Sequence, residues 1–402
     1  MSAHDHDVAI VGGGLVGASL AIALDRAGVD TALIEATPPG AMPEVFDQRN
    51  LSFADATVNA LEALGVMQKL RTPPGSIARI HVSRAGDFGS VRLDAGDYGR
   101  AHFGKVVVAR DFGEALEARL GELAHVTRYR PVRFAGFADG EAAVRSLRLA
   151  DTAGERLLQA RLVVGADGTR SQVRDALGIG SETHDYGQRL FVARLRTQRA
   201  PDGTAYERLR DDGPTALLPR GDGHYGLVHG VAEGDADAVS ALDDEAFLDR
   251  VQQAFGWRAG RFVSIGPRSV YPLAKVVADA TVAPRAVLVG NAAQTMHPLG
   301  AQGFNLGLRD ALTLAELIAC SEDPGSDALL QAHVERRRED RERTLRFSDG
   351  LARFTANPAP WLRPLRSLGL LAVDGVPSLQ SLLAGGAMGY RGDVPELCRN
   401  QA

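Results

Sequence analysis

The first forty residues alternate between apolar runs and glycine-rich turns in a way that predicts a strand, a helix and a second strand. Residues 7–12 form a β-branched apolar run, which is typical of a strand buried on both faces. Small and apolar residues from Leu15 to Ala27 predict a helix packed against a sheet, and Gly28 supplies its C-terminal stop. Residues 29–35 are predicted to form the second strand. This order is that of a βαβ unit in a parallel sheet.

Two later segments repeat the pattern of a buried strand followed by polar residues. Residues 161–168 form a short apolar run that ends in a polar turn. Residues 286–291 form another, and a loop over residues 290–303 then leads to an apolar helix predicted from about 306 to 319. In α/β proteins the carboxyl ends of strands carry the groups that contact ligands. The alternative for residues 290–303 is a plain connection to a core helix.

Between and after these segments lie short alternating runs bounded by Gly, Asp and Pro. They cover residues 77–83, 190–196, 215–219 and 225–229, and they predict strands of an antiparallel sheet.

The C-terminal part of the chain is predicted to be helical. Residues 335–345 carry charges of both signs, with Glu339/Arg343 and Glu342/Arg346 at i,i+4, and we interpret them as a solvated helix face, contact with anionic lipid being the alternative. Residues 361–388 are rich in Leu and predict an amphipathic helix pair. Two hypotheses remain open for this pair: it packs on the rest of the chain, or it meets a membrane surface or a partner protein.

Composition narrows the class of protein. The chain has 402 residues, 45% of them hydrophobic and 24% charged, as in ordinary globular proteins of several domains. A net charge of -5 gives no reason to expect nucleic acid as a partner. Cys320 and Cys398 match no metal-binding spacing and are interpreted as lone thiols, so no metal is expected. Neither a secretion signal nor an uninterrupted apolar span is recognisable, and we expect a cytoplasmic location.

The first turn carries the strongest chemical signal. Gly12, Gly14 and Gly17 form GxGxxG between a strand and a helix, and Glu35 ends the second strand. The glycines allow a tight turn, close approach of a pyrophosphate and close helix packing, while the acid can bind an adenosine ribose. The predicted dinucleotide cradle comprises Gly12, Gly14, Leu15, Val16, Gly17 and Glu35. This motif alone does not choose between NAD and FAD.

The segment after residue 290 favours a flavin. The helix near residue 306 opens after Gly300 and Gly303 without a bulky side chain, so that its positive N-terminus is free to face a ligand. A reduced flavin ring carries negative charge near N1 and O2, whereas nicotinamide does not. Asn291 is predicted to meet a ribityl hydroxyl. The residues predicted to surround the ring are Asn291, Pro298, Gly300, Gln302, Gly303, Phe304 and Asn305.

Three segments together resemble a known family. The glycine turn with Glu35, Gly165-Ala-Asp-Gly168, and the run from Gly290 to Ala311 are similar to the class A flavoprotein monooxygenases, and within them to the ubiquinone-biosynthesis hydroxylases. The third segment most resembles the 2-octaprenyl-6-methoxyphenol hydroxylases. The resemblance implies that Arg49 and Arg110 contact FAD and that Asp167 and Gly168 support its pyrophosphate side. The wider family has Asp where this chain has Asn291, which keeps an acceptor for the ribityl hydroxyl.

The resemblance also implies an activity. It implies an FAD-dependent monooxygenase that takes hydride from transiently bound NAD(P)H, reacts with O2 and transfers oxygen from a flavin C4a-hydroperoxide to the ring of a polyprenylated phenol. His297 is the candidate for orienting or deprotonating the phenol, a purely structural role being the alternative. Two other functions remain open: a related oxidase or reductase of another lipid, and a flavin-binding assembly subunit of a quinone-biosynthesis complex. The C-terminal segment would then be the contact with that complex or with the inner membrane, to which the protein would be peripheral.

These positions predict an interleaved architecture. Residues 1–75, 105–180 and 281–320 are expected to form a Rossmann-like FAD-binding domain, and residues 76–104 and 181–280 an antiparallel-sheet substrate domain, as in para-hydroxybenzoate hydroxylase. Residues 321–402 are expected to form a helical C-terminal segment.

Overall fold

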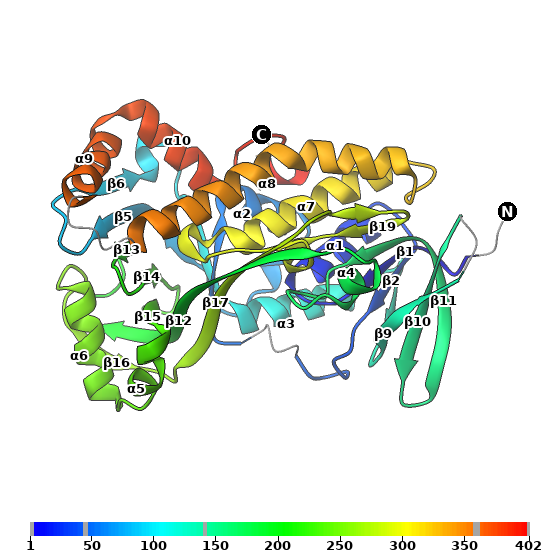
Figure 1. Cartoon of the computed structure of the whole chain (residues 1–402), viewed down its shortest axis with the longest axis horizontal. Helices are drawn as coiled ribbons and strands as arrows, with labels where there is room; N and C mark the ends of the chain where they lie inside the picture. Colours follow the sequence, from blue (N-terminus) through cyan, green and yellow to red (C-terminus); the bar gives the residue numbers. More distant parts are fainter. Residues whose placement is uncertain (1–3, 43–46, 140–142, 357–361, 400–402) are drawn as a thin grey trace.

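The computed structural model describes residues 4–42, 47–139, 143–356 and 362–399. It has two large sheets, a small third sheet and a helical C-terminal region (Figure 1). The α/β class and the helical C-terminal region predicted from the sequence are therefore confirmed. The domain boundaries given above stay a prediction.

The sheet that contains the first strand has eight strands and a parallel centre. Strands β19, β11, β1, β2 and β8 pair in parallel in that order, and β18, β10 and β9 extend the sheet through antiparallel pairs. Apolar clusters cover both of its faces, as a parallel sheet requires. The strands are β1 (His6–Val11), β2 (Thr31–Ile34), β8 (Val126–Tyr129), β9 (Arg133–Ala138), β10 (Arg145–Asp151), β11 (Gly154–Gly165), β18 (Val282–Ala283) and β19 (Ala286–Leu288).

Helices cover one face of this sheet and confirm the predicted strand–helix–strand order. They are α1 (Leu15–Arg26), α3 (Ala109–Leu120) and α7 (Gln302–Ala319), with α2 (Asp55–Ala63) beside them on the small third sheet, and the short α4 (Gln172–Ala176) lies on the other face. Gly28 ends α1 with a φ of +73°, which an L side chain rarely adopts. The second strand is shorter than predicted because the Val29 N–H still bonds back to the Leu24 carbonyl of α1.

The second large sheet has nine strands, in the order β20-β17-β12-β15-β14-β13-β5-β6, with β16 paired to β12. Its pairs are antiparallel except that β13 and β5 run parallel, a point the sequence did not predict. The strands are β5 (Arg79–Arg84), β6 (Ser90–Asp94), β12 (Ser181–Thr197), β13 (Thr204–Leu209), β14 (Thr215–Pro219), β15 (Tyr225–Ala232), β16 (Phe262–Ile265), β17 (Ser269–Ala278) and β20 (Gln294–Thr295). Helix α6 (Asp244–Phe255) packs on this sheet through Phe247 and Phe255, next to the short α5 (Ala236–Ser240).

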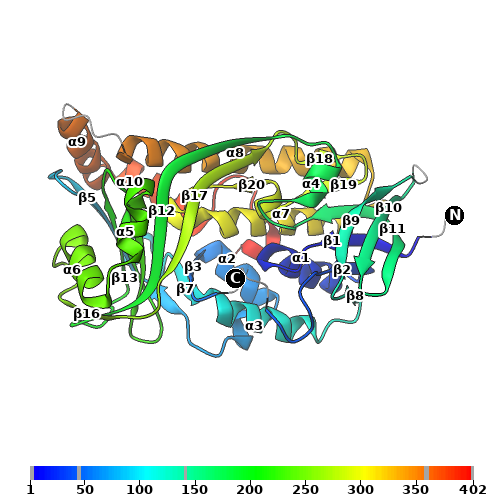
Figure 2. The same cartoon turned by 60° about the horizontal axis from the view of Figure 1, so that its bottom comes forward.

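The prediction of one strand over residues 77–83 is confirmed for residues 79–83 and wrong at its start. The chain bends at Ala78, whose N–H bonds to the Gly203 carbonyl, and this bend separates two strands of different sheets. Strand β4 (Gly75–Ile77) belongs to a three-stranded sheet with β3 (Asn50–Ala54) and β7 (Gly104–Val108), while β5 joins the nine-stranded sheet. The long strands β12 and β17 run side by side from the nine-stranded sheet toward the parallel sheet (Figure 2).

The C-terminal region consists of α8 (Asp327–Ala356), which packs along α7, and of α9 (Leu362–Gly375) and α10 (Pro377–Met388). Trp361, at the start of the predicted helix pair, lies outside the described residues. No single helix among residues 4–42, 47–139, 143–356 and 362–399 is long and apolar enough to cross a membrane. Two consecutive helices, Pro364–Gly375 and Pro377–Met388, together have the length and apolar composition of a membrane span, and they are bent by 87° at their junction.

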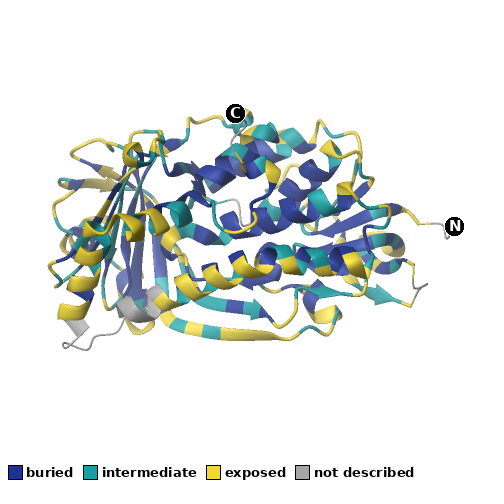
Figure 3. Ribbon diagram, turned by 90° about the horizontal axis from the view of Figure 1, so that it is seen from above, coloured by how far each residue is buried: buried dark blue, intermediate teal, exposed yellow. Residues whose placement is uncertain are grey.

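The prediction that residues 335–345 form a solvated helix face is wrong in part. The ion pairs Glu339/Arg343 and Glu342/Arg346 are present on the exposed side of α8. Arg337 and Asp340 are buried, however, because α7 turns Arg309 and Asp310 toward α8 and the four side chains form one ionic network. Exposed and buried residues accordingly alternate along α8, and helices coloured by burial in Figure 3 show this alternation.

Candidate active site

A cavity of about 1120 Å³ lies between the parallel sheet, the nine-stranded sheet and the C-terminal helices. It exceeds the range of about 300–1,000 Å³ that is usual for a single small ligand. The β1–α1 turn, the ends of β2, β11 and β19 and the start of α7 line one part, and β5, β6, β13, β14, α9 and α10 line another. The cavity therefore has room for a dinucleotide and a second ligand.

The glycine turn forms a cradle that side chains would fill. Gly12 has a φ of +107°, and a Cβ there would lie 2.5 Å from the Ala166 carbonyl oxygen. A Cβ on Gly17 would lie 1.9 Å from the Gly12 carbonyl oxygen. Gly14 is the N-cap of α1 and provides no side-chain bond, so that the first N–H groups of the helix have no side-chain cap. Such a helix N-terminus binds phosphate through its N–H groups and its dipole.

Glu35 lies at the end of β2 and is held by the neighbouring backbone. Its two carboxylate oxygens accept hydrogen bonds from the Gly13 N–H at 2.8 Å and the Thr37 N–H at 3.0 Å. The side chain lines the cavity beside the glycine turn. A fixed carboxylate in this place suits the hydroxyl groups of an adenosine ribose.

Asp167 lies in the turn that follows β11 and organises it. Its carboxyl accepts hydrogen bonds from Ser171 Oγ at 2.5 Å and from the Val173 N–H at 3.1 Å. Burial raises the pKa of Asp167, and these hydrogen bonds offset only part of the shift. Gly168 follows with a φ of +85°, and both residues line the cavity.

The segment after β19 is structured and ends in the open N-terminus of α7. It forms two short 3-10 turns and strand β20, and α7 begins at Gln302, four residues before the predicted start. Ala301 caps the helix in the left-handed conformation, with a φ of 51° and without a side-chain hydrogen bond. Because residues 300–303 line the cavity, the N-terminus of α7 is placed to stabilise negative charge on a ligand ring.

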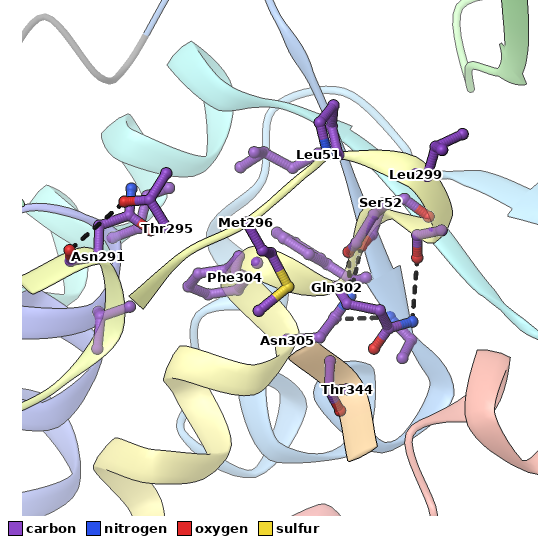
Figure 4. Close-up of a pocket in the computed structure, with 18 of the residues that line it drawn as sticks. Leu51, Ser52, Asn291, Thr295, Met296, Leu299, Gln302, Phe304, Asn305 and Thr344 are labelled. Carbon is purple, nitrogen blue, oxygen red and sulfur yellow. Dashed lines mark hydrogen bonds between the residues drawn. The ribbon is translucent and has the colours of Figure 1, made fainter. Parts of the chain in front are cut away.

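Asn305 holds this helix start against β3 (Figure 4). Its Oδ1 accepts a hydrogen bond from the Ala54 N–H at 2.9 Å, and its Nδ2 donates to the Ser52 carbonyl at 3.0 Å and the Ala301 carbonyl at 2.7 Å. The side chain is 1% exposed. Since all these bonds go to backbone groups, Asn305 orients the α7 N-terminus. Its neighbours Gln302 and Phe304 line the cavity beside it.

The structure brings the predicted cofactor residues together around one cavity, with two exceptions among them. Gly17 packs behind the turn, and the Arg110 side chain is exposed at the start of α3. Arg49 does line the cavity, but its guanidinium binds the Asp47 carboxylate and lies 4.2 Å from the centre of the Tyr271 ring. Contacts of individual residues with a bound cofactor stay a prediction.

His297 does not line the cavity in the described part of the chain. It is 2% exposed, its Nδ1 accepts the Leu299 N–H at 3.2 Å, and its ring packs edge to face with the Tyr186 ring at a centroid distance of 4.9 Å. Burial lowers the pKa of His297 to about 4, so the ring is neutral at physiological pH. This geometry favours the structural role, which is to hold the loop before α7, over proton transfer to a substrate.

The second wall of the cavity includes strands of the antiparallel sheet predicted to bind the substrate, but Glu207 is not among the predicted site residues. The members of this wall are mostly apolar, but Glu207 on β13 places one carboxyl among them. A signal was present: in Ala205-Tyr-Glu-Arg-Leu209, strand alternation puts Glu207 on the same face as Ala205 and Leu209. A carboxyl between two apolar inward positions is an anomaly that marks a candidate site.

Comparisons with known proteins agree with this arrangement. A family model described as "FAD binding domain" matches residues 5–348. The chain is 34% identical over 391 residues to the ubiquinone hydroxylase UbiL of Rhodospirillum rubrum, covering 95% of this chain and 89% of that protein. It is 29% identical over 389 residues to the 3-demethoxyubiquinol 3-hydroxylase of Escherichia coli, and the match covers 94% of this chain and 97% of that protein. The crystal structure of p-nitrophenol 4-monooxygenase PnpA from Pseudomonas putida superposes with a TM-score of 0.79 at 18% identity. The superposition covers 98% of this chain and 99% of that chain.

Proposed function

Because the chain belongs to the FAD-binding-domain family and is an FAD-dependent monooxygenase, we propose that it hydroxylates the aromatic ring of a polyprenylated phenol in ubiquinone biosynthesis. NAD(P)H and O2 are the co-substrates. The reaction consumes one NAD(P)H, one proton and one O2, and it yields the hydroxylated ring, NAD(P)⁺ and water.

The observation that carries this proposal is the apolar compartment beyond the dinucleotide cradle. Its walls are apolar side chains from two strands of the nine-stranded sheet and from both C-terminal helices: Ile80, Val82, Val91, Leu93, Leu370, Val373 and Leu383. The same cavity reaches the N-terminus of α7. A ligand that fits both parts has a polar ring at one end and a long apolar chain at the other.

The chain's own residues bind and orient the reactants. Bound FAD would supply the redox chemistry, namely acceptance of hydride from NAD(P)H and activation of O2. The glycine turn and Glu35 would hold its adenosine half, and the α7 N-terminus would stabilise negative charge on its ring. The apolar walls exclude water from the reacting centre, which protects oxygen transfer from loss as H2O2.

The test is turnover of the FAD-loaded protein with NAD(P)H, O2 and a farnesylated methoxyphenol. We expect phenol-stimulated NAD(P)H oxidation and a product heavier by one oxygen atom, with the label incorporated from ¹⁸O2 and not from labelled water. Phenol-stimulated oxidation that yields only H2O2 or a dehydrogenated lipid would favour the oxidase or reductase alternative. Absence of NAD(P)H oxidation with every phenol would favour the assembly-subunit alternative.

The outer face of the C-terminal helix pair supports a second part of the proposal, docking on a lipid bilayer. This face, which we call the α9–α10 apolar face, consists of exposed side chains: Leu365, Leu368, Leu371, Val376, Leu379 and Leu382. Among the side chains described for the pair, charges stay off this face, because Arg366 is buried in an ion pair with Asp87 and Asp374 accepts a hydrogen bond from the Arg92 N–H of β6. Phe88, 71% exposed, lies beside α9, where its backbone N–H donates a hydrogen bond to Ser367 Oγ.

Two further observations favour a bilayer over a protein as the occupant. The two helices together have the length and hydropathy of a membrane-embedded bent pair. Their inner side lines the apolar compartment through Leu370, Val373 and Leu383, so that the same helices separate the cavity from the proposed bilayer. A bilayer docked on the outer face would then lie only one layer of helices away from the compartment that receives the prenyl chain.

Charge on the α9–α10 apolar face is expected to release the protein from membranes. Leu368→Glu combined with Leu382→Glu should lower sedimentation with phosphatidylethanolamine–phosphatidylglycerol vesicles at least about tenfold, since burying a carboxylate in the acyl region is costly. Leu157→Glu, on an equally exposed leucine of β11, is the matched control and should bind as the unchanged protein does. Equal vesicle binding by the double variant, or no binding by any form, would overturn the docking proposal.

A further inference from the structure

Glu207 is the one cavity-lining carboxyl on β13, and its surroundings are apolar. Its neighbours across the sheet are Val82 on β5 and Ala216 on β14. Within the described residues, no hydrogen bond or ion pair of its carboxyl is observed, and burial alone acts on its pKa. Glu207 is half-buried where it lines the cavity, and holding a carboxyl in apolar surroundings without a partner is unfavourable, so its presence calls for a ligand that provides one.

The position of Glu207 along β13 places it between the two parts of the cavity. Two residues further on, Leu209 packs with Leu299 of the loop that leads into α7. Two residues before it, Ala205 belongs to the apolar cluster that includes Leu370 and Val373 of α9. Glu207 therefore lies at the boundary between the dinucleotide side and the apolar compartment.

We propose that Glu207 binds the ring hydroxyl of the phenol substrate and thereby fixes the ring between the flavin side and the compartment that receives the prenyl chain. This inference rests on the proposed function and adds to it the residue that selects a free phenol. The Glu207 carboxylate accepts the O–H of the phenol in a charge-assisted hydrogen bond, and no bond is formed or broken at Glu207. A phenol whose hydroxyl is methylated has no proton to donate and is rejected.

The environment of Glu207 gives this selection a pH dependence. Burial raises the pKa of Glu207 to about 7, and the flanking residues on β5 and β14 contribute no charge. The titratable groups on the helical wall of the cavity are Arg309, Asp340 and Arg391, of which Arg309 and Asp340 bind each other. Above about pH 7 the carboxylate accepts from a phenol and repels an ether oxygen, whereas below it the protonated acid donates to either.

The test is equilibrium binding, which does not depend on turnover. The probes are 2-farnesylphenol and its methyl ether, and the readout is quenching of flavin fluorescence in the FAD-loaded protein. At pH 8 we expect the unchanged protein to prefer the phenol at least about tenfold, and the preference to shrink toward pH 6. Glu207→Gln should bind both probes with similar affinity at every pH, and Glu207→Leu should prefer the ether. Glu182→Gln, on the exposed part of β12, is the matched control and should keep the preference.

The outcomes separate this inference from the proposed function. A pH-dependent phenol preference that is lost in Glu207→Gln, together with no hydroxylated product, would uphold the assignment of Glu207 and overturn hydroxylation. Hydroxylated product with an unchanged preference in Glu207→Gln would do the reverse. If the unchanged protein binds neither probe, both proposals fall. FAD content and melting temperature equal to those of the unchanged protein establish that the variants are folded.

Discussion

Replacing Asp340 with alanine is expected to lower the free energy of unfolding by about 3–5 kcal/mol, the usual cost of removing one partner from a buried ion pair. Asp340 is 1% exposed and accepts hydrogen bonds from Arg309, at 2.7 Å, and from Arg337. Without it, the Arg309 guanidinium loses its ion-pair partner. Arg337 keeps its bond to Asp310. The network joins α7 to α8, so the loss also loosens the wall of the cavity that Arg309 and Asp340 line.

The same network predicts a direction for the pH dependence of stability. Burial by itself raises the pKa of Asp340, but Arg309 and Arg337 outweigh burial and hold the pKa below its usual value of 3.8. A carboxyl with a depressed pKa in the folded state contributes stability above its unfolded pKa and loses that contribution as the pH falls. The difference in stability between the unchanged protein and Asp340→Ala should therefore be complete at neutral pH and shrink below about pH 4.

The control for Asp340 is a carboxylate on the opposite side of the same helix. Glu342 forms an exposed i,i+4 pair with Arg346, and exposed pairs contribute about 0–1 kcal/mol. Glu342→Ala should therefore leave the melting temperature nearly unchanged. Thermal unfolding of the three proteins, each loaded with FAD, provides the comparison. If the melting temperature of Asp340→Ala lies within about a degree of that of Glu342→Ala, the buried charges of α8 do not contribute to the stability of the folded protein.

The contrast between these two carboxylates shows where sequence patterns stop being sufficient. The stretch from residue 335 to 345 has charges on every side, and local spacing correctly predicts the pairs Glu339/Arg343 and Glu342/Arg346. Spacing along one helix says nothing about which face a second helix covers. Burial of Asp340 follows from Arg309 and Asp310 on α7, a partner that only the tertiary structure identifies.

The candidate site shows the same division between local and distant causes. The glycine turn, Glu35 and the open start of α7 are local features. The conformational freedom of glycine and the free N–H groups at a helix start depend on only a few consecutive residues, so the sequence alone predicts them. Glu207 becomes part of the site only through its strand neighbours, and the parallel pair β5–β13 joins segments more than a hundred residues apart. His297 shows the converse, since this histidine of the predicted loop stands between two cavity-lining residues, Met296 and Pro298, and does not itself line the cavity.

Gly17→Ala is expected to weaken FAD binding about tenfold to a hundredfold. A Cβ at this position would lie 1.9 Å from the Gly12 carbonyl oxygen and 3.1 Å from the Ala166 Cβ, so the glycine turn must move outward. Overpacking of this kind costs about 1–3 kcal/mol, and each 1.4 kcal/mol corresponds to a tenfold change in a binding constant. The displaced backbone is the part of the chain that would approach the pyrophosphate.

The measurement is titration of the apoprotein with FAD, followed by flavin fluorescence and paired with the melting temperature of the apoprotein. Gly234→Ala is the matched control, because a Cβ there meets nothing within 4 Å. A higher dissociation constant for FAD with a small change in melting temperature would locate the effect in the cradle. An unchanged dissociation constant in Gly17→Ala would mean that the turn absorbs the extra methyl group without moving, and that the close approach of α1 to β1 is dispensable for holding the dinucleotide.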